Sequence, residues 1–338
     1  MFCIPITEHS QVAAARRAAI HLARQAGLND TDTGRAALVA TEAATNLVKH
    51  ASSGQLVMRS LDGAGIELLA LDRGPGMRFI GECLRDGYST TGSLGIGLGA
   101  ITRLAAMWDI YSVPGKGTAL LAWVREGQRS GALPAPESGR VPTLEIGAIC
   151  WPMPGEDVSG DAWACELRPG RGLLVVADGL GHGPGAAEAA QLAVQVVRAH
   201  PTGEPTALLG LMHGALRHTR GAAVAVVEVD LGRQQVTFAG VGNIAGTLIT
   251  AAKPHPFISQ NGIVGHHVRK IQAVNAPWTA EAILILHSDG LAGRWNLGAY
   301  PGLNTRHASL IAGVLYRDFT RGRDDVTVLV VKQQSGSR

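Results

Sequence analysis

One stretch of the chain, residues 126–142, interrupts the apolar periodicity that runs through the rest of the sequence. It reads EGQRSGALPAPESGRVP, so Gly, Ser, Pro and charged residues replace the periodic apolar positions. The chain has 338 residues, a usual length for two domains, and each flank is long enough for its own core. We therefore predict a first domain over residues 1–125, a linker over 126–142 and a second domain over 143–338.

Both flanks mix helical and strand patterns. Apolar residues at helical spacing predict helices over 9–26, 31–52, 97–107, 188–200, 205–219 and 307–319. Short apolar runs between turn residues predict strands over 55–60, 66–72, 108–113, 117–124, 143–151, 161–168, 172–178, 223–230, 234–241, 282–289 and 323–332. In the second flank the strands come in pairs with helices bunched between them, which favours an α+β sandwich over a wound parallel sheet.

Composition and charge exclude several classes of function. The net charge is only +3, and the Lys and Arg residues form no basic run interleaved with aromatics, so we expect neither nucleic acid nor a charged membrane surface as partner. The N-terminal residues do not resemble a signal peptide, and no apolar run approaches the ~20 residues of a membrane helix. The four cysteines lack zinc or disulfide spacing, as expected of a cytoplasmic protein.

Acidic residues in the second flank stand beside strand ends or glycines. They are Asp161 in SGD, Asp178 in VVADGLGHG, Asp289 in LHSDGL, and Asp324 with Asp325 before VTVLVV. A carboxylate at a strand end projects into a cleft, and a neighbouring Gly lets the backbone turn sharply and offer its carbonyl. Converging carboxylates repel one another unless cations lie between them, and oxygen ligands suit Mg²⁺ or Mn²⁺. Two such ions acidify a bridging water and hold a phosphate for attack, although any one Asp-Gly pair alone is typical of a turn.

Taken in this order, SGD, ADGLGHG, SDG and DDVTVLVV resemble the SpoIIE-like branch of the metal-dependent protein phosphatases (PPM class), over residues 143–332, and GVGN at 240–243 fits as well. The resemblance implies a PPM-type αββα sandwich and serine/threonine phosphatase activity with two Mn²⁺ or Mg²⁺ ions. Its implied site consists of Asp178 bridging both metals, the Gly179 carbonyl completing one, Asp289 and Asp324 binding the other, Asp161 holding metal-bound water, and Asp325 where many relatives have Asn.

Two histidines lie close to these motifs in the sequence. His182 follows the Asp-Gly pair two positions later than the histidine of the broader class, which favours a structural loop residue over a general acid. His287 precedes the SDG motif, and its position fits support of the metal site and packing at a strand end equally well.

Three elements of the first flank fit a nucleotide pocket without a P-loop, since no GxxxxGK[ST] occurs. Glu42 and Asn46 lie four residues apart on one face of a predicted helix. Asp72, Gly74 and Gly76 follow a predicted strand. Gly95, Gly97 and Gly99 open another helix, whose free backbone N–H groups and dipole attract phosphate, and Thr118 then begins the last strand.

In order, these elements resemble the N, G1 and G2 boxes of the GHKL ATPase superfamily, and the RsbT-like anti-sigma-factor serine kinases in particular, over residues 8–125. The resemblance implies a Bergerat-type α/β sandwich that binds ATP and Mg²⁺. It also implies roles for the residues: Asp72 reads adenine, supported by Gly74, Gly76 and Thr118; Asn46 holds Mg²⁺; Gly95, Gly97 and Gly99 wrap the phosphates; and Glu42 orients or deprotonates the attacking hydroxyl.

Together the two resemblances favour a bifunctional switch. The first domain is expected to phosphorylate Ser or Thr of a partner, and the second to remove the phosphate. The resemblance suggests STAS-domain antagonists of the RsbS and RsbR kind as these partners, upstream of a stress-response sigma factor. One alternative is a first domain that binds ATP and sequesters a partner without transferring phosphate. Another is a phosphatase domain that serves only as a scaffold.

Overall fold

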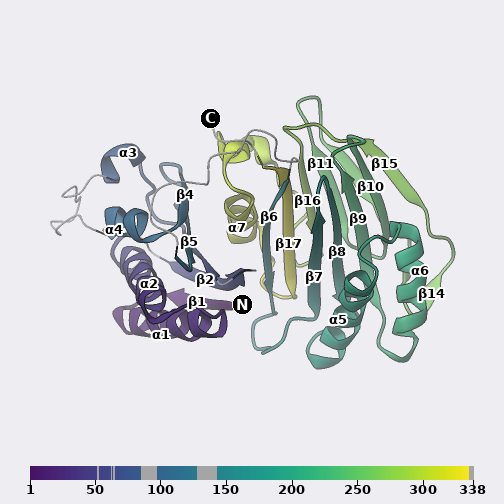
Figure 1. Ribbon diagram of the computed structural model, residues 1–338, viewed down its shortest axis with the longest axis horizontal. Coiled ribbons are helices and arrows are strands. Elements are labelled where there is room, and N and C mark those ends of the chain that lie inside the picture. The colour runs from purple at the N-terminus through teal and green to yellow at the C-terminus, as the bar shows by residue number, and fades with distance from the viewer. Residues whose placement is uncertain (52, 62, 64, 85–96, 128–142, 335–338) are drawn as a thin grey trace. The chain divides into compact units, whose positions relative to one another are not determined.

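The computed structural model describes residues 1–51, 53–61, 63, 65–84, 97–127 and 143–334 (Figure 1). Contacts divide the chain into two compact units, the first formed by residues 1–135 and 305–317, the second by residues 136–304 and 318–336. The predicted domain limits at residues 126–142 remain a prediction, because residues 128–142 lie outside the described part. Among the described helices, none has the length and apolarity that a bilayer crossing requires.

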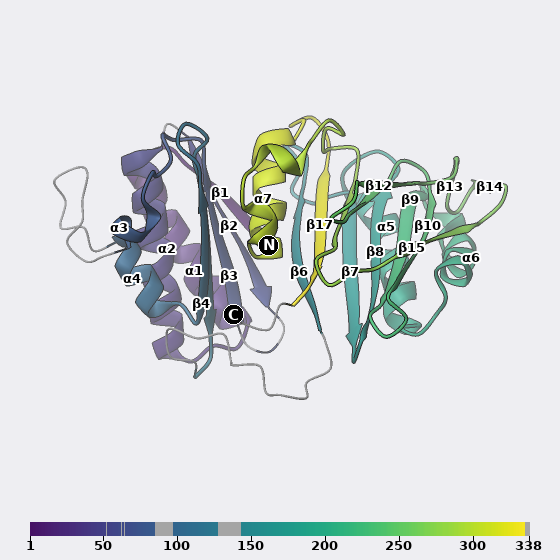
Figure 2. The same ribbon diagram turned by 90° about the horizontal axis from the view of Figure 1, so that it is seen from above.

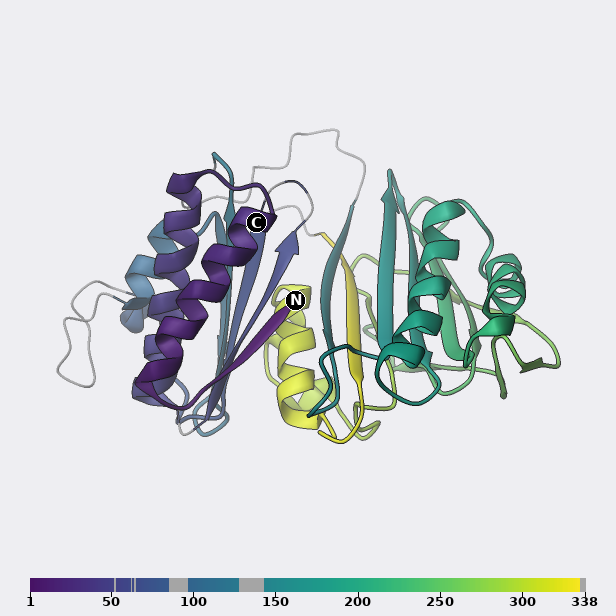
Figure 3. The ribbon, with the colours of Figure 1, turned by 90° about the horizontal axis from the view of Figure 1, so that it is seen from below.

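The part of the first unit that precedes residue 128 is one antiparallel sheet with helices on one face. Its strands are β1 (Phe2–Ile6), β2 (Gly54–Leu61), β3 (Gly65–Asp72), β4 (Met107–Ser112) and β5 (Thr118–Arg125), in the order β1-β2-β3-β5-β4. Its helices are α1 (His9–Gln25), α2 (Asp30–His50), α3 (Ile80–Cys83) and α4 (Gly97–Leu104). Figure 3 shows α1 and α2 lying side by side over the sheet. The strand β1 was not predicted.

Small buried residues and a cap explain how these helices form. Ala15, Ala19 and Ala23 of α1 are fully buried, and such small side chains let a helix pack closely. The Asn29 side chain accepts a hydrogen bond from the backbone N–H of Asp32 at 2.9 Å and so caps α2. Since β3 is buried on both faces, it forms a continuous apolar run up to Asp72, which emerges at its end.

The second unit is a sandwich of two antiparallel five-stranded sheets, seen along their edges in Figure 2. One sheet has the order β15-β10-β9-β8-β7 and the other β12-β11-β16-β17-β6. The strands are β6 (Leu144–Trp151), β7 (Asp161–Arg168), β8 (Arg171–Gly179), β9 (Ala222–Asp230), β10 (Gln235–Val241), β11 (Ala245–Ile249), β12 (His255–Ile258), β15 (Ala273–Pro277), β16 (Ile283–His287) and β17 (Val326–Gln333), with a small pair β13 (Gly262–Ile263) and β14 (His267–Val268).

Two helices cover the outer face of the first of these sheets. They are α5 (Pro184–Ala199) and α6 (Pro205–Ala215), and they pack on β8 and β9. Between the sheets, the rings of Phe238 and Phe257 stack with centroids 4.9 Å apart. The predicted α+β class with two sandwiches is confirmed, whereas the strands between residues 245 and 277 were missed because they are short and partly exposed.

A third helix, α7 (Ala308–Phe319), precedes β17 in the chain. Its residues up to Arg317 are part of the first unit by their contacts. A Cβ atom at Gly313 would come within 2.6 Å of the Leu69 side chain, so this helix approaches β3 closely.

Candidate functional site

Strand pairing brings the acidic residues of the second unit together. Asp161 begins β7, Asp178 lies near the end of β8, and the antiparallel register pairs these two residues directly. In the other sheet, Asp289 follows β16, and Asp324 and Asp325 precede β17. The strands β16 and β17 are antiparallel neighbours. The turn chemistry at strand ends and the sheet register together explain why residues far apart in sequence converge.

Asn243 links the acids of the two sheets. Its side-chain amide donates to Asp289 Oδ2 at 2.8 Å and to Asp178 Oδ2 at 3.3 Å. The GVGN motif is visible in the sequence, but no role was predicted for Asn243 itself. A polar residue two positions after a buried strand, with a glycine between, was the signal that could have identified it.

Two glycines beside these acids permit close backbone approaches. A Cβ atom at Gly179 would lie 2.0 Å from the carbonyl oxygen of Ala186, in the first turn of α5. At Gly290 it would lie 2.0 Å from the carbonyl oxygen of Asp325. No larger residue fits at either position, so the Asp-Gly pairs here are more than surface turns.

Three of the five acidic residues face a common cavity of about 630 Å³. Asp178, Asp289 and Asp324 line it, so the three predicted principal metal ligands lie at one site. The other lining residues are Met153, Leu180, Gly181, His182, Ala223, Gly242, Asn243, Asn261, Gly262, Ile263 and Arg323. Asp161 and Asp325 are each only 3% exposed and are not among the lining residues that the structure describes.

Burial and mutual repulsion raise the pKa values of these carboxyls. Burial is the main cause for Asp178, whose pKa rises to about 8, and the charges of Asp161 and Asp289 add to it. Burial likewise raises the pKa of Asp161 to about 7, against the hydrogen bond from Ser288. The pKa of Asp324 is raised by burial and by Asp289. Such a cluster carries its full charge at neutral pH only when cations offset the repulsion.

The donor set fits hard divalent cations. Asp161 Oδ1 and Asp325 Oδ2 are buried and have no hydrogen-bond partner within the described part of the chain, although Asp325 Oδ1 accepts from the Met153 N–H at 2.9 Å. The acidic side chains offer carboxylate oxygens, the ligands that Mg²⁺ and Mn²⁺ prefer. Within the described residues, no three His, Cys, Asp or Glu side chains are grouped tightly enough to hold an ion alone. Backbone carbonyl oxygens, such as that of Gly179, and water are needed to complete the coordination.

The two histidines near the motifs differ in their surroundings. His182 lines the cavity, with Nδ1 2.5 Å from Glu156 Oε1. His287 is buried; its Nδ1 lies 2.9 Å from the Ser288 carbonyl oxygen, and its Nε2 accepts from the Trp295 indole N–H at 3.2 Å. Burial lowers the pKa of His287, and this neutral ring supports the turn that carries Asp289.

Ser288 orients Asp161, and its removal is expected to weaken metal binding. The Ser288 hydroxyl donates to Asp161 Oδ2 at 2.6 Å and accepts from the Thr327 N–H at 2.9 Å. Loss of such a supporting bond costs about 10–100-fold in metal affinity. We expect Ser288→Ala to raise the Mn²⁺ concentration for half-maximal thermal stabilisation by this factor. Ser259→Ala, at a serine whose hydroxyl donates to the Ile244 carbonyl oxygen at 2.6 Å, should not change it, and equal Mn²⁺ curves for both variants would contradict the role.

In the first unit, Asp72 organises one end of a second cavity. Its Oδ1 accepts from the backbone N–H groups of Gly74 at 2.7 Å and Thr118 at 3.1 Å. Burial raises the pKa of Asp72, and these two N–H groups oppose the rise. Gly76 has φ +69°, and a Cβ atom there would lie 2.2 Å from the Val113 carbonyl oxygen, which explains the need for glycine.

At the other end, Glu42 and Asn46 of α2 meet the start of α4. A Cβ atom at Gly97 would lie 3.1 Å from both Glu42 Oε2 and Asn46 Oδ1. The Asn46 Nδ2 atom is buried and has no hydrogen-bond partner among the residues that the structure describes, as expected of a side chain that awaits a ligand. Gly99 is buried in α4, and Gly95 lies outside the described residues.

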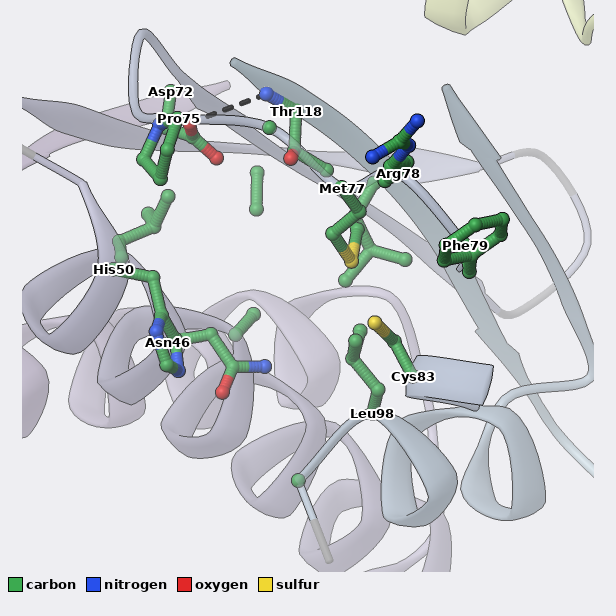
Figure 4. A pocket seen from close by; sticks show the side chains of 16 residues that line it. Asn46, His50, Asp72, Pro75, Met77, Arg78, Phe79, Cys83, Leu98 and Thr118 are labelled. Carbon is green, nitrogen blue, oxygen red and sulfur yellow. Dashed lines mark hydrogen bonds between the residues drawn. The ribbon is translucent and has the colours of Figure 1, made fainter. Parts of the chain in front are cut away.

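Figure 4 shows Asn46, Asp72 and Thr118 around this cavity, which measures about 340 Å³. Gly76 and Gly97 also line it. The remaining lining residues were not predicted from the sequence; they are Ala43, Leu47, His50, Ala70, Pro75, Met77, Arg78, Phe79, Cys83, Leu98 and Leu120. Of these, His50 had a signal, because it continues the four-residue spacing of Glu42 and Asn46 along α2. A mostly apolar wall with a few polar groups suits a flat purine base and a phosphate tail.

Two family models match separate parts of the chain. The family model described as histidine kinase-like ATPase domain matches residues 6–123. The model described as stage II sporulation protein E (SpoIIE) matches residues 168–334.

Individual relatives match one part of the chain each. The serine/threonine-protein kinase RsbT of Bacillus subtilis (strain 168) is 32% identical over 128 residues, which are 36% of this chain and 96% of RsbT. The phosphoserine phosphatase RsbX of the same organism is 22% identical over 40% of this chain and 69% of RsbX. A crystal structure of RsbX with magnesium superposes with a TM-score of 0.51 at 19% identity, over 60% of this chain and 100% of that one.

A chain from a structural study of the bacterial stressosome superposes with a TM-score of 0.53 at 30% identity, over 56% of this chain and 99% of that chain.

Proposed function

The chain belongs to the family of the serine/threonine kinase RsbT through its N-terminal residues and carries a SpoIIE-like serine/threonine phosphatase domain after them, and from this premise we propose that it both adds phosphate to a partner protein and removes it. One observation carries the phosphatase half of the proposal. Asp178, Asp289 and Asp324, from distant parts of the sequence, line one cavity.

The phosphatase residues have separate tasks in this proposal. Asp178 with the Gly179 carbonyl, and Asp289 with Asp324, would hold two Mn²⁺ or Mg²⁺ ions, and Asp161 would hold an ordered water. Two such ions, when bound, supply the positive charge that positions a phosphate and acidifies a water.

The protein itself supplies the orientation of these groups. The Asn243 amide keeps the Asp178 and Asp289 oxygens at fixed positions, since it donates to both. Asp325 anchors the Met153 backbone beside the cavity. His182, held by Glu156 through Nδ1, presents its ring to the same cavity, where it would offer a proton to the departing hydroxyl oxygen.

The kinase residues would position ATP and the accepting hydroxyl. Asp72, with Thr118 beside it, would accept from the adenine amino group, and Asn46 would hold Mg²⁺ on the phosphates. The start of α4 at Gly97 would bind the phosphate tail through its free N–H groups. Glu42, next to Asn46, would orient the attacking hydroxyl, and phosphoryl transfer depends mainly on such positioning and on charge neutralisation.

We propose STAS-domain antagonists of the RsbS and RsbR kind as the partners, in the control of a stress-response sigma factor. The likeness to RsbT and RsbX and to a chain of a stressosome study supports this choice. We place the exchange in the cytoplasm, where ATP is available.

A second candidate is a first unit that binds ATP and a partner without phosphoryl transfer. The buried, unpartnered Asn46 amide is explained equally well by nucleotide binding alone. Glu42 favours catalysis, because holding a nucleotide does not require this carboxylate beside Asn46.

Glu42→Gln separates the two candidates. The assay uses labelled ATP and a STAS partner, in an Asp178→Asn background so that the phosphatase does not remove the label. We expect Glu42→Gln to reduce label transfer about 10²–10³-fold, because it removes the group that positions the hydroxyl. The ATP dissociation constant, measured by calorimetry, should change by no more than about 2-fold, because the amide has the same shape.

The parent protein provides the control. If it binds ATP and the partner but never labels that partner, the kinase proposal fails and the binding-module candidate replaces it.

A further inference from the structure

A late segment of the chain, residues 305–317, completes the first unit. The backbone N–H of His307 donates to Asp109 Oδ2 at 2.8 Å. The Ser309 hydroxyl donates at 2.8 Å to Glu67 Oε2, a carboxylate that is only 3% exposed. These bonds attach the beginning of α7 to strands β3 and β4.

The end of the same segment reaches the nucleotide cavity from behind. Arg317 is only 4% exposed, and its Nη1 donates to the carbonyl oxygen of Asp72 at 2.9 Å and to that of Thr118 at 3.5 Å. In return, the Arg73 guanidinium donates to the Arg317 carbonyl oxygen. Arg317 therefore binds the backbone carbonyl groups of Asp72 and Thr118. The same two residues are also bonded to each other, because the Thr118 N–H donates to Asp72 Oδ1.

From Arg317 the chain leads directly to the acidic cavity. Only six residues, 318–323, separate it from Asp324. Within this connection the backbone N–H of Arg321 donates to the Gly290 carbonyl oxygen at 2.9 Å, beside Asp289. The Phe319 carbonyl oxygen accepts from the Ala292 N–H at 2.9 Å. The connection thus contacts the loop that presents Asp289 and ends at Asp324.

We propose that Arg317 couples the two sites, so that a nucleotide bound against Asp72 and Thr118 tightens divalent-metal binding at the phosphatase cavity. The nucleotide fixes the two carbonyl groups that Arg317 holds. A fixed Arg317 restrains the connection 318–323, and this reduces the conformational entropy that Asp324 loses when it binds a metal. This inference rests on the proposed nucleotide and metal sites.

The test measures Mn²⁺ binding directly, from the electron paramagnetic resonance signal of free Mn²⁺, and phosphatase activity on p-nitrophenyl phosphate, each against buffered free Mn²⁺ with and without saturating ADP. We expect ADP to lower the half-saturating Mn²⁺ concentration of the unmodified protein about 3–10-fold, within the usual range of coupling between sites. Asp72→Asn, which weakens the nucleotide site but leaves chelation of Mn²⁺ by ADP in solution unchanged, should lose this shift.

Variants of Arg317 show whether the shift of the Mn²⁺ curve by ADP depends on this residue. We expect Arg317→Ala to abolish the shift while it still hydrolyses the substrate, and Arg317→Lys, which keeps the charge but not the planar guanidinium whose Nη1 reaches both carbonyl oxygens, to reduce it. Arg321→Ala is the matched control, because it removes the same charge from the connection and should keep the shift.

Two results would overturn the coupling. One is an unmodified protein that binds ADP by calorimetry and hydrolyses the substrate, yet shows equal Mn²⁺ curves with and without ADP. The other is an Arg317→Ala variant with an undiminished shift. The first result needs no variant to fold, and in either case the proposed nucleotide and metal sites would stand while the coupling between them fails.

Discussion

Asp178→Asn should reduce phosphatase activity about 10³-fold, because it removes a carboxylate that would hold the divalent cations, whose charge stabilisation is worth several kcal/mol. The same substitution should stabilise the metal-free protein. Burial and the neighbouring acids raise the pKa of Asp178 to about 8, well above the 3.8 of a free aspartate. Below pH 4 both the folded and the unfolded chain hold the Asp178 proton, so this residue does not lower the free energy of unfolding there. As the pH rises from 4 toward 8 the unfolded chain releases the proton while the folded protein keeps it, and the free energy of unfolding falls.

The measurement is the melting temperature in EDTA between pH 5 and pH 8, followed by titration with Mn²⁺. The unmodified protein should lose stability toward pH 8 and regain it with Mn²⁺. Asp178→Asn should melt about 4 °C higher than the unmodified protein at pH 8 in EDTA and respond little to Mn²⁺. Asp157→Asn, at an exposed carboxylate of the same unit, should alter neither property. Retained activity in Asp178→Asn, or a metal-free melting temperature that is flat with pH, would disprove this account of the cavity.

Asp72→Asn should weaken ATP binding about 100-fold while the fold is kept. The new amide oxygen can still accept from the Gly74 and Thr118 N–H groups, as Asp72 Oδ1 does. The amide nitrogen, however, is itself a hydrogen-bond donor, so it cannot accept a hydrogen bond from the adenine amino group. A lost buried hydrogen bond with an unpaired donor costs about 3 kcal/mol, which corresponds to about two decades in affinity.

Calorimetric titration with ATP checks this prediction. Asp30→Asn, at an exposed carboxylate in the first turn of α2, is the control and should bind ATP as the unmodified protein does. An Asp72→Asn variant with unchanged ATP affinity would mean that adenine does not contact Asp72. A variant with a lower melting temperature and proportionally weaker binding would mean that Asp72 acts only through the turn it holds.

The local motifs of both units could be predicted because their chemistry is local. An aspartate after a buried strand, followed by glycine, combines a strand end, a sharp turn and a projecting carboxylate within a few residues. The four-residue spacing of Glu42 and Asn46 likewise places both on one helix face without any tertiary information. For this reason the sequence identified Asp178, Asp289, Asp324, Asp72 and Asn46 as parts of two separate sites.

Residues that act across the fold had no such local signal. Asn243 joins Asp178 to Asp289 only because two sheets stack, and Ser288 reaches Asp161 only because their strands end at the same edge of the sandwich. The sequence alone therefore determined the class of fold, through periodicity and turn residues, and it indicated the kind of chemistry through the resemblance of its ordered motifs to known families. The tertiary structure decided which groups orient the acids, and it placed Arg317 on the carbonyl groups behind the nucleotide cavity, because a contact over 245 residues of sequence depends on packing and not on local spacing.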